Sequence, residues 1–226
     1  MPQYDYPRPM LTVDIFLLRL HTDHFEILLI QRRNDPFTGK WALPGGYVEI
    51  DEPLEAAAKR ELFEETGIQN TPLFKMNLFG DPGRDPRGRT ITVVYFGVPA
   101  ESVELPKAGD DAMLAQWFSL GRLPDLAFDH DRIIDGCYHK FKSNLLLRLW
   151  FLLFVDDEFS TKELSQLANM IDYELKEDKI KAILINVPFV KAKRKNVFRK
   201  EIGNEDLLKL SDADFSEIWS SILLAN

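Results

Sequence analysis

Three glutamates at helical spacing, Glu61, Glu64 and Glu65, are the side chains whose positions most clearly suit chemistry. They lie in a segment, residues 53–67, that begins with proline, is rich in Ala, Leu, Glu and Lys, and ends with glycine, which is typical of a helix. With 3.6 residues per turn, the three carboxylates share an arc of roughly 100°. Arg60, four residues before Glu64, offsets only part of their repulsion. A further positive charge is therefore expected at this face.

The helical face that carries the glutamates also carries apolar residues, and these indicate the nature of the expected positive charge. Leu54 and Ala58 are in line with Glu61 and Glu65, and an apolar line normally packs against a core. Carboxylates on that line are partly desolvated, so a divalent cation is a natural counter-charge. Hard oxygen ligands favour Mg²⁺ or Mn²⁺, which also bind substrate phosphates. The alternative is a solvated acidic face that pairs with neighbouring basic residues.

The residues around the glutamates follow a longer pattern, G-x5-E-x7-R-E-U-x-E-E-x-G-U, in which U is a bulky aliphatic residue. Every specified position is filled, by Gly46, Glu52, Arg60, Glu61, Leu62, Glu64, Glu65, Gly67 and Ile68. This pattern is the signature of the Nudix hydrolases, and the chain resembles that family over residues of about 10 to 140. A match at all these positions favours the metal site over the solvated acidic face.

The resemblance implies that water attacks a diphosphate that links a nucleoside to another group. On the matching positions, Glu61 and Glu65 resemble metal ligands, and Glu64 resembles a ligand or the base that activates water. Arg60 resembles a residue that orients these carboxylates, and the backbone carbonyl of Gly46 resembles a further ligand. A bound Mg²⁺ or Mn²⁺ lowers the pKa of water and neutralises diphosphate oxygens.

The general base of this family often comes from a loop outside the motif. Glu101, Glu104, Asp110 and Asp111 are candidates, and the sequence leaves the choice among them open. Glu52, inside the motif, resembles a structural residue that ties the loop to the helix.

Two segments beside the motif narrow the substrate. Residues 31–46, QRRNDPFTGKWALPGG, resemble the same segment of ADP-ribose pyrophosphatase-like members, and residues 84–89, RDPRGR, place three arginines in one loop. Arginine forks suit diphosphate oxygens, and aromatic rings stack on bases. Core packing of the aromatic residues and a solvated arginine loop are the alternatives, and other dinucleotides or nucleotide sugars stay open as substrates. The expected substrate-binding residues are Arg32, Phe37, Trp41, Arg84, Arg87 and Arg89.

A second group within the family is also similar to this chain. Residues 84–89 and residues 126–130, LAFDH, resemble the Nudix-related transcriptional regulators of bacteria. In these, a Nudix-like domain binds ADP-ribose or a sugar, and a C-terminal winged helix binds operator DNA. His130 is expected to cap a helix or to pack in the core. Because such regulators need only bind their effector, many have lost motif carboxylates, so the intact motif favours catalysis.

The C-terminal segment, residues 140–226, is too long for a frayed tail. A capping-box pattern at residues 160–163 predicts the start of a helix, which suits a helix-turn-helix. Residues 191–200 hold six basic side chains and no acid, and their second half resembles the basic stretch of the regulators. The candidate contacts to operator DNA are therefore Lys195, Arg199 and Lys200. The alternative is a helical extension that forms a homodimer or covers the active site.

The elements that must position these residues are alternating β-rich and helical segments. Strands are expected at residues 11–18, 25–30, 74–79, 90–98 and 115–120, and helices dominate from about residue 129. The apolar run 145–154 predicts one buried helix. The expected fold class is α/β (α+β), with a Nudix α/β/α sandwich at residues 1–139. A mostly helical domain, a winged helix-turn-helix in the regulator interpretation, is expected at residues 140–226.

The composition is that of a folded protein with unevenly distributed charge. The 226 residues are 45% hydrophobic and 12% aromatic, which excludes a disordered chain. The net charge of −8 falls wholly on residues 1–139, with 22 acidic and 14 basic side chains, whereas residues 140–226 hold 14 of each. A local basic patch is therefore compatible with the acidic total.

The sequence also predicts the cellular compartment. The single cysteine, Cys137, forms no internal disulfide and is expected in the core. The N-terminus lacks the pattern of a signal peptide, and the apolar runs are shorter than a membrane-spanning helix. We expect a cytoplasmic protein that has no membrane partner and binds a nucleotide sugar or dinucleotide.

Overall fold

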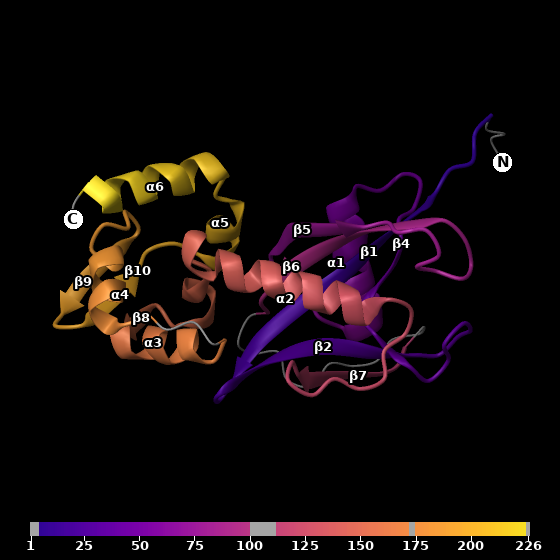
Figure 1. Ribbon diagram of the computed structural model, residues 1–226, viewed down its shortest axis with the longest axis horizontal. Helices are drawn as coiled ribbons and strands as arrows, with labels where there is room; N and C mark the ends of the chain where they lie inside the picture. Colours follow the sequence, from indigo (N-terminus) through magenta and orange to yellow (C-terminus); the bar gives the residue numbers. More distant parts are fainter. Residues whose placement is uncertain (1–4, 100–111, 172–174, 225–226) are drawn as a thin grey trace. The chain divides into compact units, whose positions relative to one another are not determined.

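The structure is a computed structural model, and it describes residues 5–99, 112–171 and 175–224. The chain divides into two compact units, shown in Figure 1. The segment up to Arg19 and Phe25–Tyr138 form the first unit, whereas Leu20–His24 and His139–Asn226 form the second. In the described part of the chain, no helix is both long and apolar enough to cross a membrane.

The first unit is built on a mixed sheet. Its order is β3-β2-β1-β6-β5, with β4 paired to β1 and β7 paired to β2. Strands β1 and β6 run parallel, and the other described pairs in this sheet are antiparallel. The strands are β1 (Met10–His21), β2 (His24–Arg32), β3 (Trp41–Ala42), β4 (Gly45–Tyr47), β5 (Leu73–Phe79), β6 (Thr90–Gly97) and β7 (Ala112–Ser119). Each strand expected from the sequence is present, with bounds shifted by a few residues.

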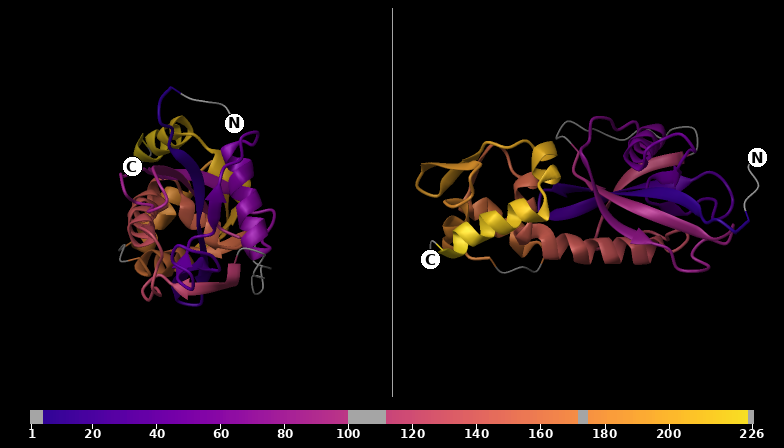
Figure 2. Two further views of the ribbon diagram at one scale, coloured as in Figure 1. Left: turned by 90° about the vertical axis from the view of Figure 1, so that its right-hand side faces the viewer. Right: turned by 90° about the horizontal axis from the view of Figure 1, so that it is seen from above.

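Helices cover both faces of this sheet, as Figures 1 and 2 show. Side chains of β1 alternate between the faces, so Val13, Ile15 and Leu17 pack in one buried cluster with the helix α1 (Leu54–Thr66). The first part of α2 (His130–Leu147) lies on the opposite face. At Gly136 the helix lies close to β5, since a Cβ at this position would be 3.1 Å from the ring of Phe79. This arrangement is the expected sandwich.

One predicted element is wrong. The apolar run 145–154 is not a single helix, because α2 ends at Leu147 and Leu149 takes a left-handed conformation with φ 53°. A short 3-10 helix, η1 (Trp150–Phe154), follows. The turn lets both ends of η1 pack on Phe141, whose ring centroid lies 6.2 Å from that of Trp150 and 5.8 Å from that of Phe154. Aromatic packing therefore outweighs helix continuity here.

The second unit has the element order of a winged helix-turn-helix. Strands β8, β9 and β10 form an antiparallel sheet in the order β8-β10-β9, and α3 contacts α4. The predicted capping box is confirmed, since Ser160 and Glu163 satisfy each other's backbone N–H groups. The elements are β8 (Glu158–Ser160), α3 (Thr161–Asn169), α4 (Glu177–Leu184), β9 (Val190–Arg194), β10 (Val197–Lys200), α5 (Asn204–Lys209) and α6 (Asp212–Leu224).

Candidate functional site

Two glycines bring the strand β4 into contact with the acidic face of α1. The backbone N–H of Gly45 donates to Glu65 Oε2 at 2.8 Å. A Cβ at Gly45 would lie 2.1 Å from the carbonyl oxygen of Val13, and one at Gly46 would lie 2.4 Å from Glu61 Oε1. The backbone of β1 therefore excludes a side chain at Gly45, whereas a side chain at Gly46 would displace the Glu61 carboxylate.

Arg60 ties the motif together. Its guanidinium donates to both oxygens of Glu52, at 2.6 and 3.1 Å, and to the carbonyl oxygen of Tyr47 at 3.0 Å. It also donates to Glu61 at 2.9 Å and to Glu64 at 3.0 Å. These bonds, above all those that Arg60 donates to Glu52, raise the pKa of Arg60. Glu52 therefore links the loop to the helix, as expected, and Arg60 orients two of the three carboxylates.

The three glutamates differ in exposure. Glu65 is buried and the Glu61 side chain is 13% exposed, whereas that of Glu64 is 54% exposed. Burial raises the pKa of Glu61, although its bond to Arg60 acts in the opposite direction. Their oxygens do not all converge within 4.8 Å. Two desolvated carboxylates beside a side-chain-free backbone at Gly46 nevertheless form a donor set that fits a hard divalent cation.

The four acids left open as the general base, Glu101, Glu104, Asp110 and Asp111, lie outside the described residues. Among the motif carboxylates, Glu64 is the most exposed and so the most accessible to water.

A pocket of about 450 Å³ opens beside Glu65 and Gly46. Its wall carries both signs of charge. The guanidinium groups come from three of the predicted arginines, and the acids come from β1, α1 and the arginine loop. The charged lining residues are Arg32, Arg84, Arg87, Asp14, Glu65 and Asp85.

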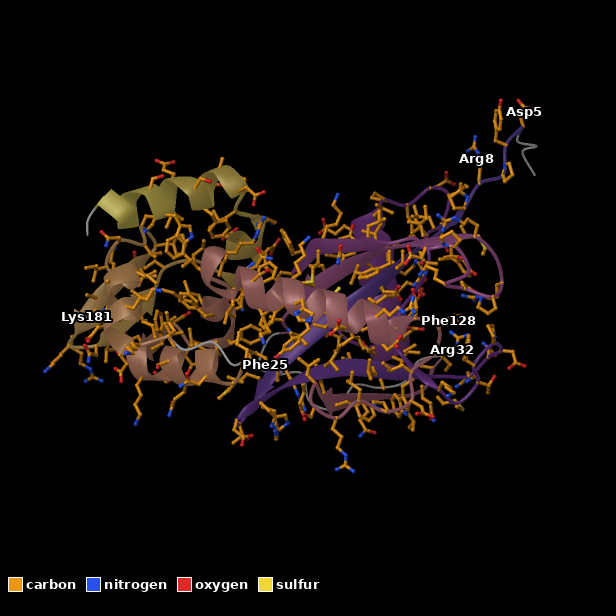
Figure 3. All side chains as sticks on the ribbon, viewed as in Figure 1. Asp5, Arg8, Phe25, Arg32, Phe128 and Lys181 are labelled. Atoms are coloured by element: carbon orange, nitrogen blue, oxygen red, sulfur yellow. The ribbon has the colours of Figure 1, made fainter. Side chains whose placement is uncertain are left out.

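The ring of Phe128 organises one side of the pocket. The guanidinium carbon of Arg32 lies 4.8 Å from its centroid, and that of Arg87 lies 5.1 Å from it. Figure 3 labels Arg32 and Phe128, which lie side by side. Burial, followed by the nearby charge of Arg87, lowers the pKa of Arg32. Two cations on one ring repel each other, so this side of the pocket attracts an anion.

The predicted arginines and aromatic residues do not all reach the pocket. Arg84 lines it and makes a bidentate pair with Asp129 at 3.0 and 2.8 Å. Arg87 lines it and pairs with Asp85 at 2.7 Å. Arg89 instead donates to the carbonyl oxygen of Gly80.

Of the two predicted stacking residues, neither lines the pocket. Phe37 packs edge-on against Phe128, with centroids 4.8 Å apart. Trp41 packs against Phe118, with centroids 4.6 Å apart. Trp41 is only partly buried, and Phe37 contacts the ring that the arginines share. Stacking on a base stays a prediction for both residues.

Three further residues line the pocket although their sequence context does not mark them as site residues: Asp14, Phe128 and His130. His130 is 6% exposed and accepts a hydrogen bond at Nδ1 from the backbone N–H of Leu43, at 2.9 Å. Asp14 is 7% exposed and accepts from the Thr92 hydroxyl at 2.6 Å. The available signal for Asp14 was a lone acid within an otherwise apolar strand, since a buried carboxylate requires a partner.

The buried His130 predicts a pH effect on stability. Burial lowers the pKa of His130 from 6.5, so the unfolded chain takes up the proton first as the pH falls. Stability is then lost below about pH 6.5, by up to about 1.4 kcal/mol per pH unit. Between about pH 7.5 and about pH 5.5, the free energy of urea unfolding should fall less in His130→Asn than in the wild type. Equal changes in the two proteins would contradict a neutral His130.

The three candidate DNA contacts lie on the β9–β10 hairpin, but in different environments. Lys195 and Arg199 are exposed. The ammonium of Lys200 instead donates to the carbonyl oxygens of Leu152 and Val155, both at 3.0 Å, and to the side chain of Asn204. Lys200 thus holds η1 and α5 in place, because it satisfies their polar groups.

An α/β/α sandwich that presents paired carboxylates beside an arginine-lined pocket is the architecture of a metal-dependent diphosphate hydrolase. The family model of the NUDIX domain matches residues 8–137, and the chain therefore belongs to the Nudix family. Divalent metals are the general cofactors of Nudix hydrolases.

Two curated relatives and one solved structure are similar to this chain. An ADP-ribose pyrophosphatase of Methanocaldococcus jannaschii is 49% identical over 118 residues, which are 52% of this chain and 68% of that protein. The ADPR responsive transcriptional repressor NtrR of Acinetobacter baylyi is 37% identical over 141 residues, 59% of this chain and 55% of that protein. A MutT/nudix family protein from Enterococcus faecalis has a TM-score of 0.72 and 27% identity, covering 88% of this chain and 89% of that chain.

Proposed function

We propose that the first unit hydrolyses the diphosphate of ADP-ribose or a related nucleoside diphosphate derivative, with Mg²⁺ as the cofactor. The observation that carries this proposal is the position of Glu65 and Gly46 in the lining of a pocket that also holds Arg32, Arg84 and Arg87. The Glu61 carboxylate lies against Gly46. An anion that enters the pocket meets both guanidinium groups and Glu65 of the motif. The 49% identity to an ADP-ribose pyrophosphatase supports the choice of substrate.

The residues have separate tasks in this reaction. Arg32 and Arg87 attract and hold the diphosphate, and Arg60 keeps Glu61 and Glu64 oriented. Glu61, Glu65 and the carbonyl of Gly46 would hold the cation, which supplies a lowered pKa for bound water and charge neutralisation of the diphosphate. Glu64, being exposed, accepts a proton from the attacking water. The products are a nucleoside monophosphate and a phosphorylated second product.

A direct assay tests this proposal. The full chain is incubated with ADP-ribose and Mg²⁺, and AMP is followed by chromatography; AMP should form with Mg²⁺ and cease to form with excess EDTA. Mn²⁺ in place of Mg²⁺ identifies which cation supports the faster reaction. Release of no product from a broad panel of dinucleotides and nucleotide sugars would refute hydrolysis.

DNA binding by the second unit is a second candidate function. The winged arrangement places exposed basic side chains on the β9–β10 hairpin, among them Lys191, Lys193 and Lys195, and one relative is a transcriptional repressor. Phosphate contacts of this kind give salt-dependent affinity. In this interpretation the Nudix unit binds ADP-ribose or a sugar as an effector, and the partner is operator DNA.

A pair of variants tests this second function. Replacing both Lys195 and Arg199 by Ala should weaken binding to DNA from the neighbourhood of the protein's own gene, and should lower the slope of log K against log salt by about one per lost contact. Lys200→Ala is the matched control, because its ammonium bonds within the unit and its loss should lower the unfolding temperature. Absence of a DNA shift at low salt in the wild type would refute DNA binding.

A further inference from the structure

Asp14 and His130 face each other in the wall of the pocket, next to the motif but separate from it. Both side chains are more than nine-tenths buried: the side chain of Asp14 is 9% exposed and that of His130 is 7% exposed. Asp14 belongs to β1, and His130 is the first residue of α2. His130 Nε2 lies 3.8 Å from Asp14 Oδ1. This distance is too long for a hydrogen bond, so the two atoms do not satisfy each other.

The hydrogen bond from Leu43 fixes what each atom offers to a ligand. Because the Leu43 N–H donates to Nδ1, that nitrogen carries no proton. Burial favours the neutral ring, so the remaining hydrogen is on Nε2. Asp14 Oδ2 accepts from Thr92, which leaves Oδ1 on the side of His130. A donor and an acceptor thus lie side by side at the pocket wall.

We propose that Asp14 Oδ1 and His130 Nε2–H form a subsite that binds a sugar hydroxyl of the ligand. A hydroxyl is both a donor and an acceptor, so one group, or two neighbouring hydroxyls of a ribose, satisfies both atoms. Thr12 and Thr90 line the same pocket and extend its polar surface. This inference rests on the proposed function, because it assigns the sugar of the same substrate.

The charge of Asp14 argues against a phosphate at this position. A phosphate oxygen has no proton to give to a carboxylate and is repelled by it. Phosphate oxygens instead suit Arg32 and Arg87, on the same pocket wall. A site that hydrogen-bonds a hydroxyl also rejects analogues without it, because the buried polar atoms are then left without a partner.

The test measures binding to the full chain by titration calorimetry in EDTA, so that the absence of metal prevents turnover. The probes are ADP-ribose, ADP and inorganic pyrophosphate, which has the diphosphate but no sugar. In Asp14→Asn the amide oxygen takes over the hydrogen bond from the Thr92 hydroxyl, so an NH2 donor replaces the Oδ1 acceptor. His130→Asn keeps an acceptor near Leu43 but lacks the Nε2–H donor. Each variant should weaken ADP-ribose binding about 10-fold and change pyrophosphate binding less than about 2-fold.

Two further measurements separate a subsite from a structural role. His130→Gln retains an amide N–H near the Nε2 position but loses the acceptor for Leu43, so it should unfold at a lower temperature yet bind ADP-ribose better than His130→Asn does. An equal loss with ADP assigns the subsite to the adenosine ribose, whereas no loss with ADP assigns it to the second sugar; both results support the proposal.

Three results would overturn the proposal: unchanged ADP-ribose affinity in both variants, an equal loss for pyrophosphate, or a wild type that binds neither sugar-bearing probe. Failure of the proposed function looks different. ADP-ribose that binds with this pattern but is not cleaved when Mg²⁺ is added would refute hydrolysis and leave the sugar subsite intact.

Discussion

Glu65→Gln should lower kcat for ADP-ribose hydrolysis on the order of 100-fold or more while the protein stays folded. Glu65 is buried at the pocket and accepts the Gly45 N–H. An amide has the same shape and its oxygen still accepts that bond, but the negative charge that would hold a cation is lost. If Glu65 is a metal ligand, as proposed, its loss removes electrostatic stabilisation that the reaction requires. Steady-state release of AMP and the thermal unfolding temperature are the two measurements.

Glu55→Gln is a matched control on the same helix. Its carboxylate is 56% exposed and pairs with Lys59 at 2.7 Å, so the same chemical change occurs away from the pocket. Exposed i,i+4 pairs contribute about 0.3–0.5 kcal/mol, and kcat should be unchanged. Similar losses in the two variants would show that charge on α1 in general, rather than Glu65, supports activity.

The sequence predicts the local part of this site well because the motif is local. Helical spacing alone places Glu61 and Glu65 on one face, and the bonds of Arg60 to Glu52 and Glu64 lie within one short segment. The same holds for the capping box of α3, which involves residues three apart. Each of these interactions depends on neighbours in the chain and needs no knowledge of the tertiary fold.

The other part of the site is formed by contacts between segments that are distant in the sequence, and residue type alone does not predict these contacts. Phe128 meets Arg32 and Arg87 only because the sheet and the loop before α2 converge. Trp41 has the chemistry to stack on a base, yet its ring packs on Phe118, from the neighbouring strand β7.

The β9–β10 hairpin is a second case in which residue type alone does not predict the contacts of a side chain. Lys200 is adjacent to Arg199, but successive residues of a strand point to opposite faces. Arg199 is exposed, whereas Lys200 turns inward to the carbonyls of Leu152 and Val155. A linear count of basic residues therefore overestimates the surface that DNA can contact.

The two glycines before α1 should respond differently to the same small change. Gly45→Ala places a methyl group 2.1 Å from the carbonyl oxygen of Val13, at a φ of +154° that L-residues rarely adopt. Backbone cannot move aside without disturbing the β1–β4 pair. The free energy of unfolding should fall by roughly 3 kcal/mol, from overpacking and backbone strain together.

Gly46→Ala meets a side chain instead, because the new methyl group lies 2.4 Å from Glu61 Oε1. The Glu61 carboxylate can rotate away, so stability should change little, but its bond to Arg60 and its proposed position as a ligand are lost. Misplacement of a catalytic group by about 1 Å costs on the order of 100-fold in rate. Urea unfolding and AMP release should therefore distinguish the two variants. Gly45→Ala should lose stability, whereas Gly46→Ala should lose activity alone. A Gly46→Ala protein with wild-type kcat would exclude Glu61 from the reaction.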